Sequence, residues 1–501
     1  MLEIDWTTDE PAVVAGQLLV VPLREAQDGD AITQRFGAAI RDAVDRSPFN
    51  AKAGESFSFT REIDGAIQNV MLAGPTALTE PAALRQLAHD AAREAQRVGA
   101  QHLVLDLHGA DGLPAEGDDA QQVGNLVAQG VELGTYVYDR FLSESKRSPL
   151  KLEKVTAWAR SAAPSEGSAR GQIVAAAVAR ARDLGNGPPG LVTPTFLAET
   201  ATEMVEALSK DGHGVDLTVL DADECKKRGM GCFMGVGQGS DSPPKFIHLS
   251  YKPKGESKAR ICLIGKGVTF DSGGYSLKPT DGMLDMKLDM CGSAAVLASF
   301  EGAVKLQVPY ELHVLVAAAE NLVSGKAYKL GDVLTASNGK TVEINNTDAE
   351  GRLTMADAMV YGAALKPELM IDFATLTGAC IVALGPRIAG VMTRDETLHD
   401  DWMAAADRSG ETMWRLPLPE NLKEQLKSKI ADMRNTGERW GGALTAGLFL
   451  SEFNEGIRWM HVDIAGPAMA GKAYGVTTPG GTGFPVATIL ELLSGEIQTA
   501  S

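Results

Sequence analysis

The sequence predicts an α/β protein built from two domains, a smaller one over residues 1–165 and a larger one over residues 166–501. A chain of 501 residues is too long for a single ordinary core. Short apolar runs alternate with helix-forming stretches along most of the chain, which is typical of α/β folds. A segment rich in small and polar residues, 161–168, has the composition of a linker between the two parts.

The smaller domain shows strand–helix–strand alternation. Its apolar runs at 17–23, 69–74 and 102–107 are expected to be buried strands. Residues 82–97, between the last two runs, are rich in Ala, Leu, Arg and Glu and are expected to form a helix. No group of residues in this domain has the spacing of a catalytic site.

The larger domain repeats the same alternation. We expect strands at 215–220, 245–249, 261–264, 312–317, 369–373 and 459–464. We expect helices at 172–183, 291–305, 352–365, 443–453 and 486–493. This order predicts an α/β domain with a central, mostly parallel (mixed) sheet.

Composition limits the classes of partner. Hydrophobic residues make up 44% and charged residues 22%, as in ordinary globular proteins. The net charge of −18 disfavours binding to nucleic acid or to anionic lipid, so neither is expected as a partner. No apolar run reaches the length of a membrane span, and the first ten residues carry acids where a secretory signal carries Lys or Arg. We therefore expect a soluble, cytoplasmic protein, with its five cysteines as buried thiols.

One segment, 345–353, concentrates charged residues beside glycine and alanine. In an extended chain Asp348, Glu350 and Arg352 point to one side. Two neighbouring carboxylates repel each other unless a cation lies between them. Alone, such a D-x-E-x-R pattern is more typical of a solvated turn with a surface ion pair than of a metal site.

A second segment, 265–290, follows the expected strand 261–264. Asp271 lies beside a Gly-Gly pair just beyond that strand, where ligands gather in open α/β sheets. Asp289 precedes the helix expected at 291–305, and by itself it could be a helix cap. The two segments supply four carboxylates, whereas Lys278 and Arg352 offset only two charges, or three with Lys266. Two divalent cations would complete a hydrolytic site, and oxygen ligands leave Zn²⁺, Mn²⁺ and Mg²⁺ open.

These segments resemble the leucyl aminopeptidase (M17, cytosol aminopeptidase) family. The family signature N-T-D-A-E-G-R-L stands unchanged at residues 346–353, and the run G-K-G-[VI]-T-F-D-S-G-G stands at 265–274. The spacings between the acidic and basic residues of the two segments agree as well. Weaker matches lie at 185–194, 374–379 and 461–466, so the resemblance covers about residues 170–495. It implies a catalytic domain over 166–501 and a divergent, macro-like α/β domain over 1–165.

The resemblance implies a metalloprotease that hydrolyses the N-terminal residue, preferably leucine or another large apolar residue, from peptides with a free N-terminus. Two divalent ions per subunit, Zn²⁺ or Mn²⁺, and a hydroxide bridging them would perform the reaction. The implied metal ligands are Lys266, Asp271, Asp289, Asp348 and Glu350, with Asp271 and Glu350 bridging. The implied catalytic pair is Lys278, which would stabilise the oxyanion, and Arg352, which would hold a bicarbonate. The implied substrate-binding residues are Met286, Asn346, Thr375, Leu376 and Gly378.

Several alternatives stay open at this stage. Met286 could equally be ordinary core packing, while Asp372, Asp463 and His461 are interpreted as structural groups of apolar strands. A two-metal phosphoesterase would use similar carboxylates, but it usually adds histidines, and neither segment contains one. The resemblance also implies a homohexamer. Some bacterial members of the family bind DNA, which the net charge of −18 disfavours here.

Overall fold

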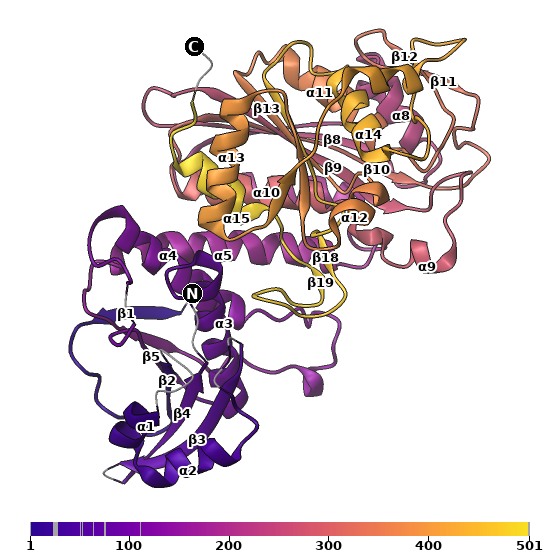
Figure 1. The fold of residues 1–501 in the computed structure, drawn as a ribbon. Helices are drawn as coiled ribbons and strands as arrows, with labels where there is room; N and C mark the ends of the chain where they lie inside the picture. The colour runs from indigo at the N-terminus through magenta and orange to yellow at the C-terminus, as the bar shows by residue number, and fades with distance from the viewer. Residues whose placement is uncertain are drawn as a thin grey trace. The chain divides into compact units, whose positions relative to one another are not determined.

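The computed structural model describes the chain except for residues 1, 24–28, 51, 53, 64, 75–76, 111 and 499–501. The protein divides into two compact units, residues 1–176 and 177–501 (Figure 1). Helix α5 (Ser165–Asn186) runs through this division, and it begins inside the segment 161–168 that was expected to be a linker. Two glycines of that region lie where α5 packs closely: a Cβ at Gly167 would be 1.8 Å from the Gln121 carbonyl oxygen, and one at Gly171 would be 2.2 Å from that of Asn125. The small residues therefore serve helix packing, and the expectation of a linker over 165–168 is wrong.

The smaller unit contains a six-stranded sheet in the order β1-β6-β5-β2-β4-β3. Neighbouring strands are parallel except for β3 and β4, which form a hairpin. The strands are β1 (Glu3–Thr7), β2 (Gln17–Pro22), β3 (Ser56–Ile63), β4 (Ala66–Ala73), β5 (His102–Asp106) and β6 (Lys154–Trp158). The helices are α1 (Gly29–Phe36), α2 (Ala38–Arg46), α3 (Pro81–Val98), α4 (Gly117–Gly134) and the short η1 (Glu144–Lys146). The three strands and the helix expected here from the sequence are confirmed.

This sheet is covered on both faces, which explains why its central strands are apolar without interruption. Successive side chains of a strand point to opposite faces. Accordingly, Leu18 and Val20 of β2 join one buried cluster with α3 and α4. Leu19 and Val21 join a second cluster with Ile32 and other residues near α1 and α2.

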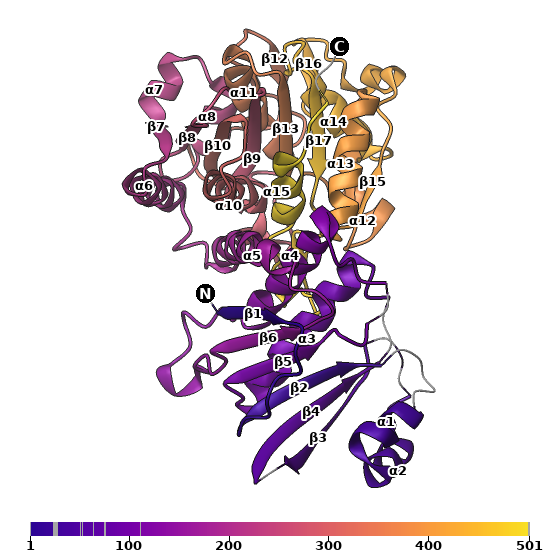
Figure 2. The ribbon, with the colours of Figure 1, turned by 90° about the vertical axis from the view of Figure 1, so that its left-hand side faces the viewer.

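The larger unit contains an eight-stranded mixed sheet in the order β15-β14-β17-β13-β9-β10-β8-β7 (Figure 2). The four central strands β17, β13, β9 and β10 are parallel, and antiparallel pairs flank them. The strands are β7 (Gly214–Leu220), β8 (Lys245–Lys252), β9 (Arg260–Asp271), β10 (Glu311–Asn321), β13 (Leu369–Ala374), β14 (Ala389–Met392), β15 (Met413–Arg415) and β17 (Trp459–Asp463). Short strands β11 (Val333–Thr335), β12 (Thr341–Glu343) and β16 (Met433–Arg434) form a separate sheet, as do β18 (Met469–Ala470) and β19 (Gly480–Gly481). The predicted two-domain α/β class with a mixed central sheet is confirmed.

Helices lie on both faces of the large sheet (Figure 1). One face carries α6 (Pro194–Lys210), α10 (Cys291–Lys305), α13 (Glu396–Ser409) and α15 (Val486–Ser494). The other carries α8 (Gly231–Gly237), α11 (Gly351–Ala364) and α14 (Gly442–Ser451). The remaining helices are α7 (Ala222–Lys227), α9 (Thr280–Met283), η2 (Met286–Leu288), α12 (Gly378–Leu384) and η3 (Glu420–Leu426). Within the described part of the chain, no helix is long and apolar enough to span a membrane.

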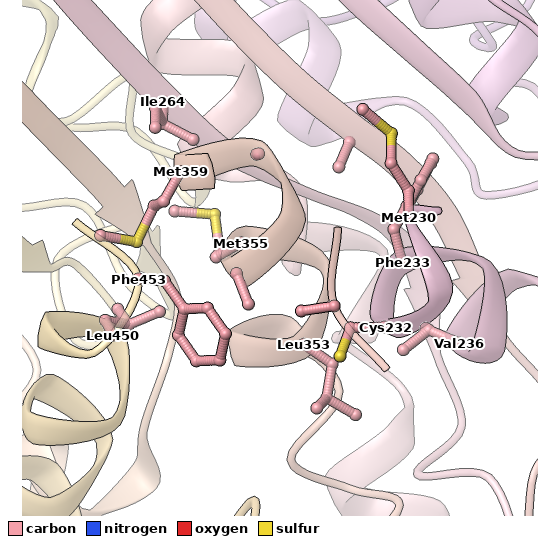
Figure 3. Close-up of a cluster of buried hydrophobic side chains, with 14 of the residues drawn as sticks. Met230, Cys232, Phe233, Val236, Ile264, Leu353, Met355, Met359, Leu450 and Phe453 are labelled. Carbon is pink, nitrogen blue, oxygen red and sulfur yellow. The ribbon is translucent and has the colours of Figure 1, made fainter. Parts of the chain in front are cut away.

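Helix α11 is fixed by a buried cluster that it shares with its neighbours. Figure 3 shows Leu353, Met355 and Met359 of this helix between side chains of α8, such as Phe233, and Phe453 just beyond α14. Every one of these side chains is buried. The cluster holds the first turn of α11 in place, and that turn follows directly on the charged segment 345–350.

Candidate active site

The charged residues of the two sequence segments meet at the carboxyl edge of the large sheet. Lys266 and Asp271 lie on the last half of β9, where Ala317 and Asn321 of β10 are their register partners. β13 ends at Ala374, beside the same part of β9. In an α/β sheet this edge is the usual place for a ligand, because parallel strands end there together and their loops fan apart.

Two helix starts complete the site. Asp289 is the cap residue immediately after η2 and lies two residues before α10 begins, and Glu350 is the cap residue immediately before α11. Gly351 lets this helix come close to β9, since a Cβ there would lie only 2.4 Å from Lys266 Cε. A larger residue at this helix start would therefore displace the end of the Lys266 side chain.

Lys266 joins the carboxylates of both helix starts. Its Nζ donates to Asp289 Oδ1 at 2.7 Å and lies 2.9 Å from Glu350 Oε1. It also donates to the backbone oxygen of Thr375 at 3.1 Å, just beyond β13. The Lys266 side chain is 4% exposed, so this ammonium group is removed from water together with its partners.

Lys278 joins the other two carboxylates. Its Nζ lies 2.9 Å from Asp271 Oδ2 and 2.6 Å from Asp348 Oδ1. Asp348 is the most open of the four acids, with 32% of its side chain exposed. The site therefore holds four carboxylates and two ammonium groups, and one side of it opens toward solvent at Asp348.

The electrostatics show how unfavourable this grouping is without further positive charge. Burial and then the nearby Glu350 raise the pKa of Asp271 to about 7, and burial also raises the pKa of Asp289 and Asp348. Burial opposes ionisation of Glu350 too, but Lys266 and Lys278 hold its pKa at about 2. Although burial disfavours a charged amine, the adjoining carboxylates raise the pKa of Lys266. Lys266 is thus a charged ammonium group that offsets part of the negative charge of the surrounding carboxylates.

The residues present suit divalent cations. Oxygens of Asp271, Asp348 and Glu350 all lie within 4.8 Å of one another. Glu350 is 1% exposed, yet its Oε2 has no hydrogen-bond partner among the described residues. A buried carboxylate oxygen without a donor is costly, and a metal ion would satisfy it. Carboxylate ligands suit hard or borderline cations such as Mn²⁺ and Zn²⁺.

Arg352, in the first turn of α11, is only partly engaged. Its Nη1 donates to the backbone oxygen of Asn435 at 2.7 Å, and its Nε has no partner in the part of the chain that the structure describes. Burial lowers the pKa of Arg352 to about 10, so the guanidinium remains charged at neutral pH. A buried guanidinium with a free N–H can hold an anion.

The residues expected to bind substrate lie around this edge. Thr375 donates from Oγ1 to Asp289 Oδ1 at 2.7 Å, and Leu376 follows it. Gly378 begins α12, and a Cβ built on it would meet nothing within 4 Å, so the space beside it is open. Met286, half-buried, begins η2 three residues before Asp289. Among the described residues, no hydrogen bond links Met286 to the other four.

Asn346 belongs to the loop that carries the acids. Its Oδ1 accepts a hydrogen bond from the backbone N–H of Asp348 at 2.8 Å. The side chain thereby turns the chain so that Asp348 faces Lys278.

Asp372, Asp463 and His461 are buried and hydrogen-bonded, as interpreted from the sequence, except that one nitrogen of His461 has no partner among the described residues. Asp372 accepts from Trp459 Nε1 and lies 2.6 Å from His461 Nδ1, and Asp463 accepts from the backbone of Leu376 and from Thr377 Oγ1. His461 is fully buried, but its Nε2 has no partner among the described residues, so this histidine is satisfied at one nitrogen only. All five cysteines are free and buried, as expected.

Sequence reasoning missed three buried polar residues that support the acids. Asn321 donates from Nδ2 to Asp271 Oδ1 at 2.8 Å and to the Thr347 backbone oxygen at 2.9 Å. Tyr328 donates to that same oxygen at 2.8 Å. Asn321 could have been found as a polar residue ending a long apolar run. Asn435 carries no such signal, because it lies far from both charged segments along the chain, and Tyr328 carries none because it lies in an irregular segment between two strands.

Comparison with known proteins shows the family of this chain. The sequence model of the cytosol aminopeptidase family matches residues 179–490 with its catalytic domain and residues 19–145 with its N-terminal domain. A probable cytosol aminopeptidase of Synechococcus sp. (strain CC9605) is 43% identical over 485 residues, which are 95% of this chain and 96% of that protein.

Two solved structures have the same fold over nearly all of the chain. A mutant tomato leucine aminopeptidase is 34% identical, with a TM-score of 0.88 over 99% of this chain and 96% of that one. The bottromycin maturation enzyme BotP in complex with Mn is 33% identical, with a TM-score of 0.83 over 96% and 99% of the two chains. The chain belongs to the cytosol aminopeptidase family of peptide hydrolases.

Proposed function

We propose that this aminopeptidase removes leucine and other large apolar residues from the free N-terminus of peptides with the help of two divalent ions, Zn²⁺ or Mn²⁺. The observation that carries the proposal is the group of four carboxylates around Lys266 and Lys278. In that group, Glu350 Oε2 is buried without a partner among the described residues.

The proposed metal ligands are Lys266, Asp271, Asp289, Asp348 and Glu350, with Asp271 and Glu350 shared between the two ions. When bound, the ions would polarise the scissile carbonyl and lower the pKa of a bridging water toward about 7. Lys266 would have to lose its proton to become a ligand. Positive charge nearby disfavours the protonated amine, so this loss would accompany metal binding.

Lys278 is proposed to stabilise the oxyanion. Its side chain is 17% exposed and its ammonium lies between Asp271 and Asp348. An ammonium held in place before reaction can donate to a carbonyl oxygen as negative charge develops there. The adjoining carboxylates raise the pKa of Lys278, against the effect of burial, so the group is charged at neutral pH.

Arg352 is proposed to hold a bicarbonate that serves as general base. Its guanidinium is anchored at Nη1 by the Asn435 backbone oxygen and keeps its Nε free of partners in the described chain. Neither the segment 265–290 nor the segment 345–353 contains a histidine that could take this role.

The side chain of the N-terminal residue would occupy the space beside Gly378, with Met286, Thr375 and Leu376 around it and Asn346 on the opposite loop. The open space where a Cβ of Gly378 would stand supports this placement. A free, uncharged α-amine could approach the acidic group as a ligand without adding charge, whereas an acetylated amine has no available lone pair. This difference would make the enzyme strictly an exopeptidase.

The proposal is tested by hydrolysis of leucyl-p-nitroanilide and N-acetyl-leucyl-p-nitroanilide at equal concentration. The metal-stripped protein should be inactive and should regain activity with Zn²⁺ or Mn²⁺, on the free amine only. Glutamyl- and lysyl-p-nitroanilide serve as controls for the apolar preference. Full activity of a verified metal-free sample, or comparable turnover of the acetylated substrate, would remove the proposal.

We further propose a catalytic domain over residues 166–501, a macro-like domain over 1–165, a cytoplasmic location and assembly as a homohexamer. The proposed location rests on the names of the relatives, which are probable cytosol aminopeptidases. Light scattering tests the assembly: the expected mass is about six times the 52.9 kDa of one chain, and a stable monomer would contradict it.

A further inference from the structure

Asn435 connects the loop of acids to a separate part of the larger unit. It follows β16 and is fully buried, although it carries a polar side chain. Its Oδ1 accepts from the backbone N–H of Asn345 at 3.0 Å and lies 3.4 Å from that of Asn346. Its Nδ2 donates to the backbone oxygen of Asn346 at 2.6 Å and lies 3.3 Å from that of Ala349.

Only an amide side chain of this length can make these contacts. The carboxamide offers an acceptor and two donors on one small planar group, which is what a run of backbone N–H and C=O groups requires. Aspartate has the same shape but no donor when ionised, so it would place an oxygen against the carbonyls of Asn346 and Ala349. Alanine would remove the side-chain partner of these four backbone groups of the loop.

The backbone of the same residue reaches Arg352. The Asn435 carbonyl oxygen accepts from Arg352 Nη1 at 2.7 Å, and its N–H donates to the Glu343 carbonyl oxygen at 3.1 Å. The latter bond continues the parallel pairing of β12 with β16, where Glu343 stands opposite Arg434. Asn435 is therefore fixed at one end by a small sheet and holds both the loop 345–349 and the guanidinium at the other.

We propose that Asn435 is a positioning residue that sets Asp348 and Glu350 relative to Arg352, and so couples metal binding to the catalytic arginine. This inference rests on the proposed two-metal function of the same site. It predicts that Asn435 variants lose metal affinity and kcat by displacing the loop. KM should change little because, of the residues proposed to line the side-chain pocket, Asn435 contacts Asn346 alone, and only through its backbone.

The chain offers a matched control at the same junction. The exposed side chain of Asn345 makes two hydrogen bonds to the backbone of Thr436, each 3.1 Å long. Asn345 Nδ2 donates to the Thr436 carbonyl oxygen, and the Thr436 N–H donates to Asn345 Oδ1. Asn345→Ala thus removes two hydrogen bonds between the same two segments, whereas Asn435→Ala removes four. The control leaves the carbonyls of Asn346 and Ala349 and the guanidinium of Arg352 paired.

The experiment measures Mn²⁺ affinity by calorimetry on the metal-stripped full chain, kcat and KM on leucyl-p-nitroanilide, and the melting temperature. Asn435→Asp and Asn435→Ala should bind Mn²⁺ about tenfold or more weakly and lose about tenfold or more in kcat, as is usual when a partner of a metal ligand is removed. KM of the Asn435 variants should stay within about threefold of wild type. Asn345→Ala should stay near wild type in Mn²⁺ affinity, kcat and KM.

Two results would overturn the inference. One is Mn²⁺ affinity close to wild type in both Asn435 variants; the other is an equal loss in Asn345→Ala at the same melting temperature. Mn²⁺ affinity is measured separately from turnover. If the wild-type protein binds Mn²⁺ but does not hydrolyse leucyl-p-nitroanilide, the proposed peptidase function is wrong. The Mn²⁺ affinities of the Asn435 variants would still test the positioning role of Asn435.

Discussion

A single added methyl group at Gly351 should disable the site without removing any of its charged groups. A Cβ at this position would lie 2.4 Å from Lys266 Cε and 2.6 Å from its Nζ. Carbon atoms prefer a separation near 3.5 Å, so the amine has to retreat by about 1 Å. Lys266 now lies 2.7 Å from Asp289 and 2.9 Å from Glu350, and a shift of that size would break one or both contacts.

The expected cost falls on function more than on stability. Replacing a glycine in a helix by alanine favours the helix by about 1 kcal/mol, which offsets part of the strain. A ligand atom displaced by about 1 Å, in contrast, lies far outside the tolerance of about 0.2 Å for a metal bond, and such a misplacement can cost about a hundredfold in rate. We expect Gly351→Ala to melt within a few degrees of wild type, to bind metal more weakly and to lose about a hundredfold in kcat/KM.

The assay compares metal content, kcat/KM on leucyl-p-nitroanilide and melting temperature with those of Gly302→Ala. Gly302 is a buried glycine of α10 where a Cβ would meet the end of Leu490 at 2.8 Å, so it brings similar crowding away from the acids. Gly302→Ala should keep its activity. Wild-type metal binding and turnover in Gly351→Ala would refute the role assigned to Lys266, and an equal loss in Gly302→Ala would show a general packing effect.

Three further predictions concern the same chain. Asp271→Asn and Glu350→Gln should lower metal content and kcat together, because both residues are proposed to contact both ions; elemental analysis beside kinetics checks this, and a loss of rate with full metal content would contradict it. Lys278→Met should retain the metals and lose about a hundredfold or more in kcat, because the aliphatic stem remains while the oxyanion loses its donor; an empty site in this variant would show that Lys278 supports binding instead. Finally, acidification from pH 7 to pH 5 should destabilise the metal-free wild type more than His248→Gln. Burial and the adjoining His313 lower the pKa of His248 to about 4, so below its unfolded pKa of about 6.5 the unfolded chain takes up the proton first, which removes about 2 kcal/mol by pH 5. Urea midpoints at the two pH values measure the difference, and equal losses in both proteins would rule out this origin.

Local sequence determined the central strands and the acids at their ends. An uninterrupted apolar run such as residues 314–319 of β10 is typical of a strand inside a sheet that is covered on both faces, so its position was predictable from the sequence. Charged residues directly after such a run, as at Asp271, have to lie at the carboxyl edge. The fold class was therefore predictable before any tertiary contact was known, whereas the grouping of the four acids was predicted from the charge balance of the two segments and from their family resemblance.

Tertiary structure decided which residue contacts which, and where small residues are needed. Gly167 was misread as part of a linker because its partner, the Gln121 carbonyl, comes from a helix distant in sequence. The division of the four acids between Lys266 and Lys278 likewise depends on how α10 and α11 approach β9. Asn435 gives the clearest case: it is 83 residues from Arg352 along the chain and has no charge, and its role arises only because β16 pairs with β12 beside the loop of acids. A hydrogen bond between distant segments leaves no periodic or local trace in a sequence, whereas burial of a strand does.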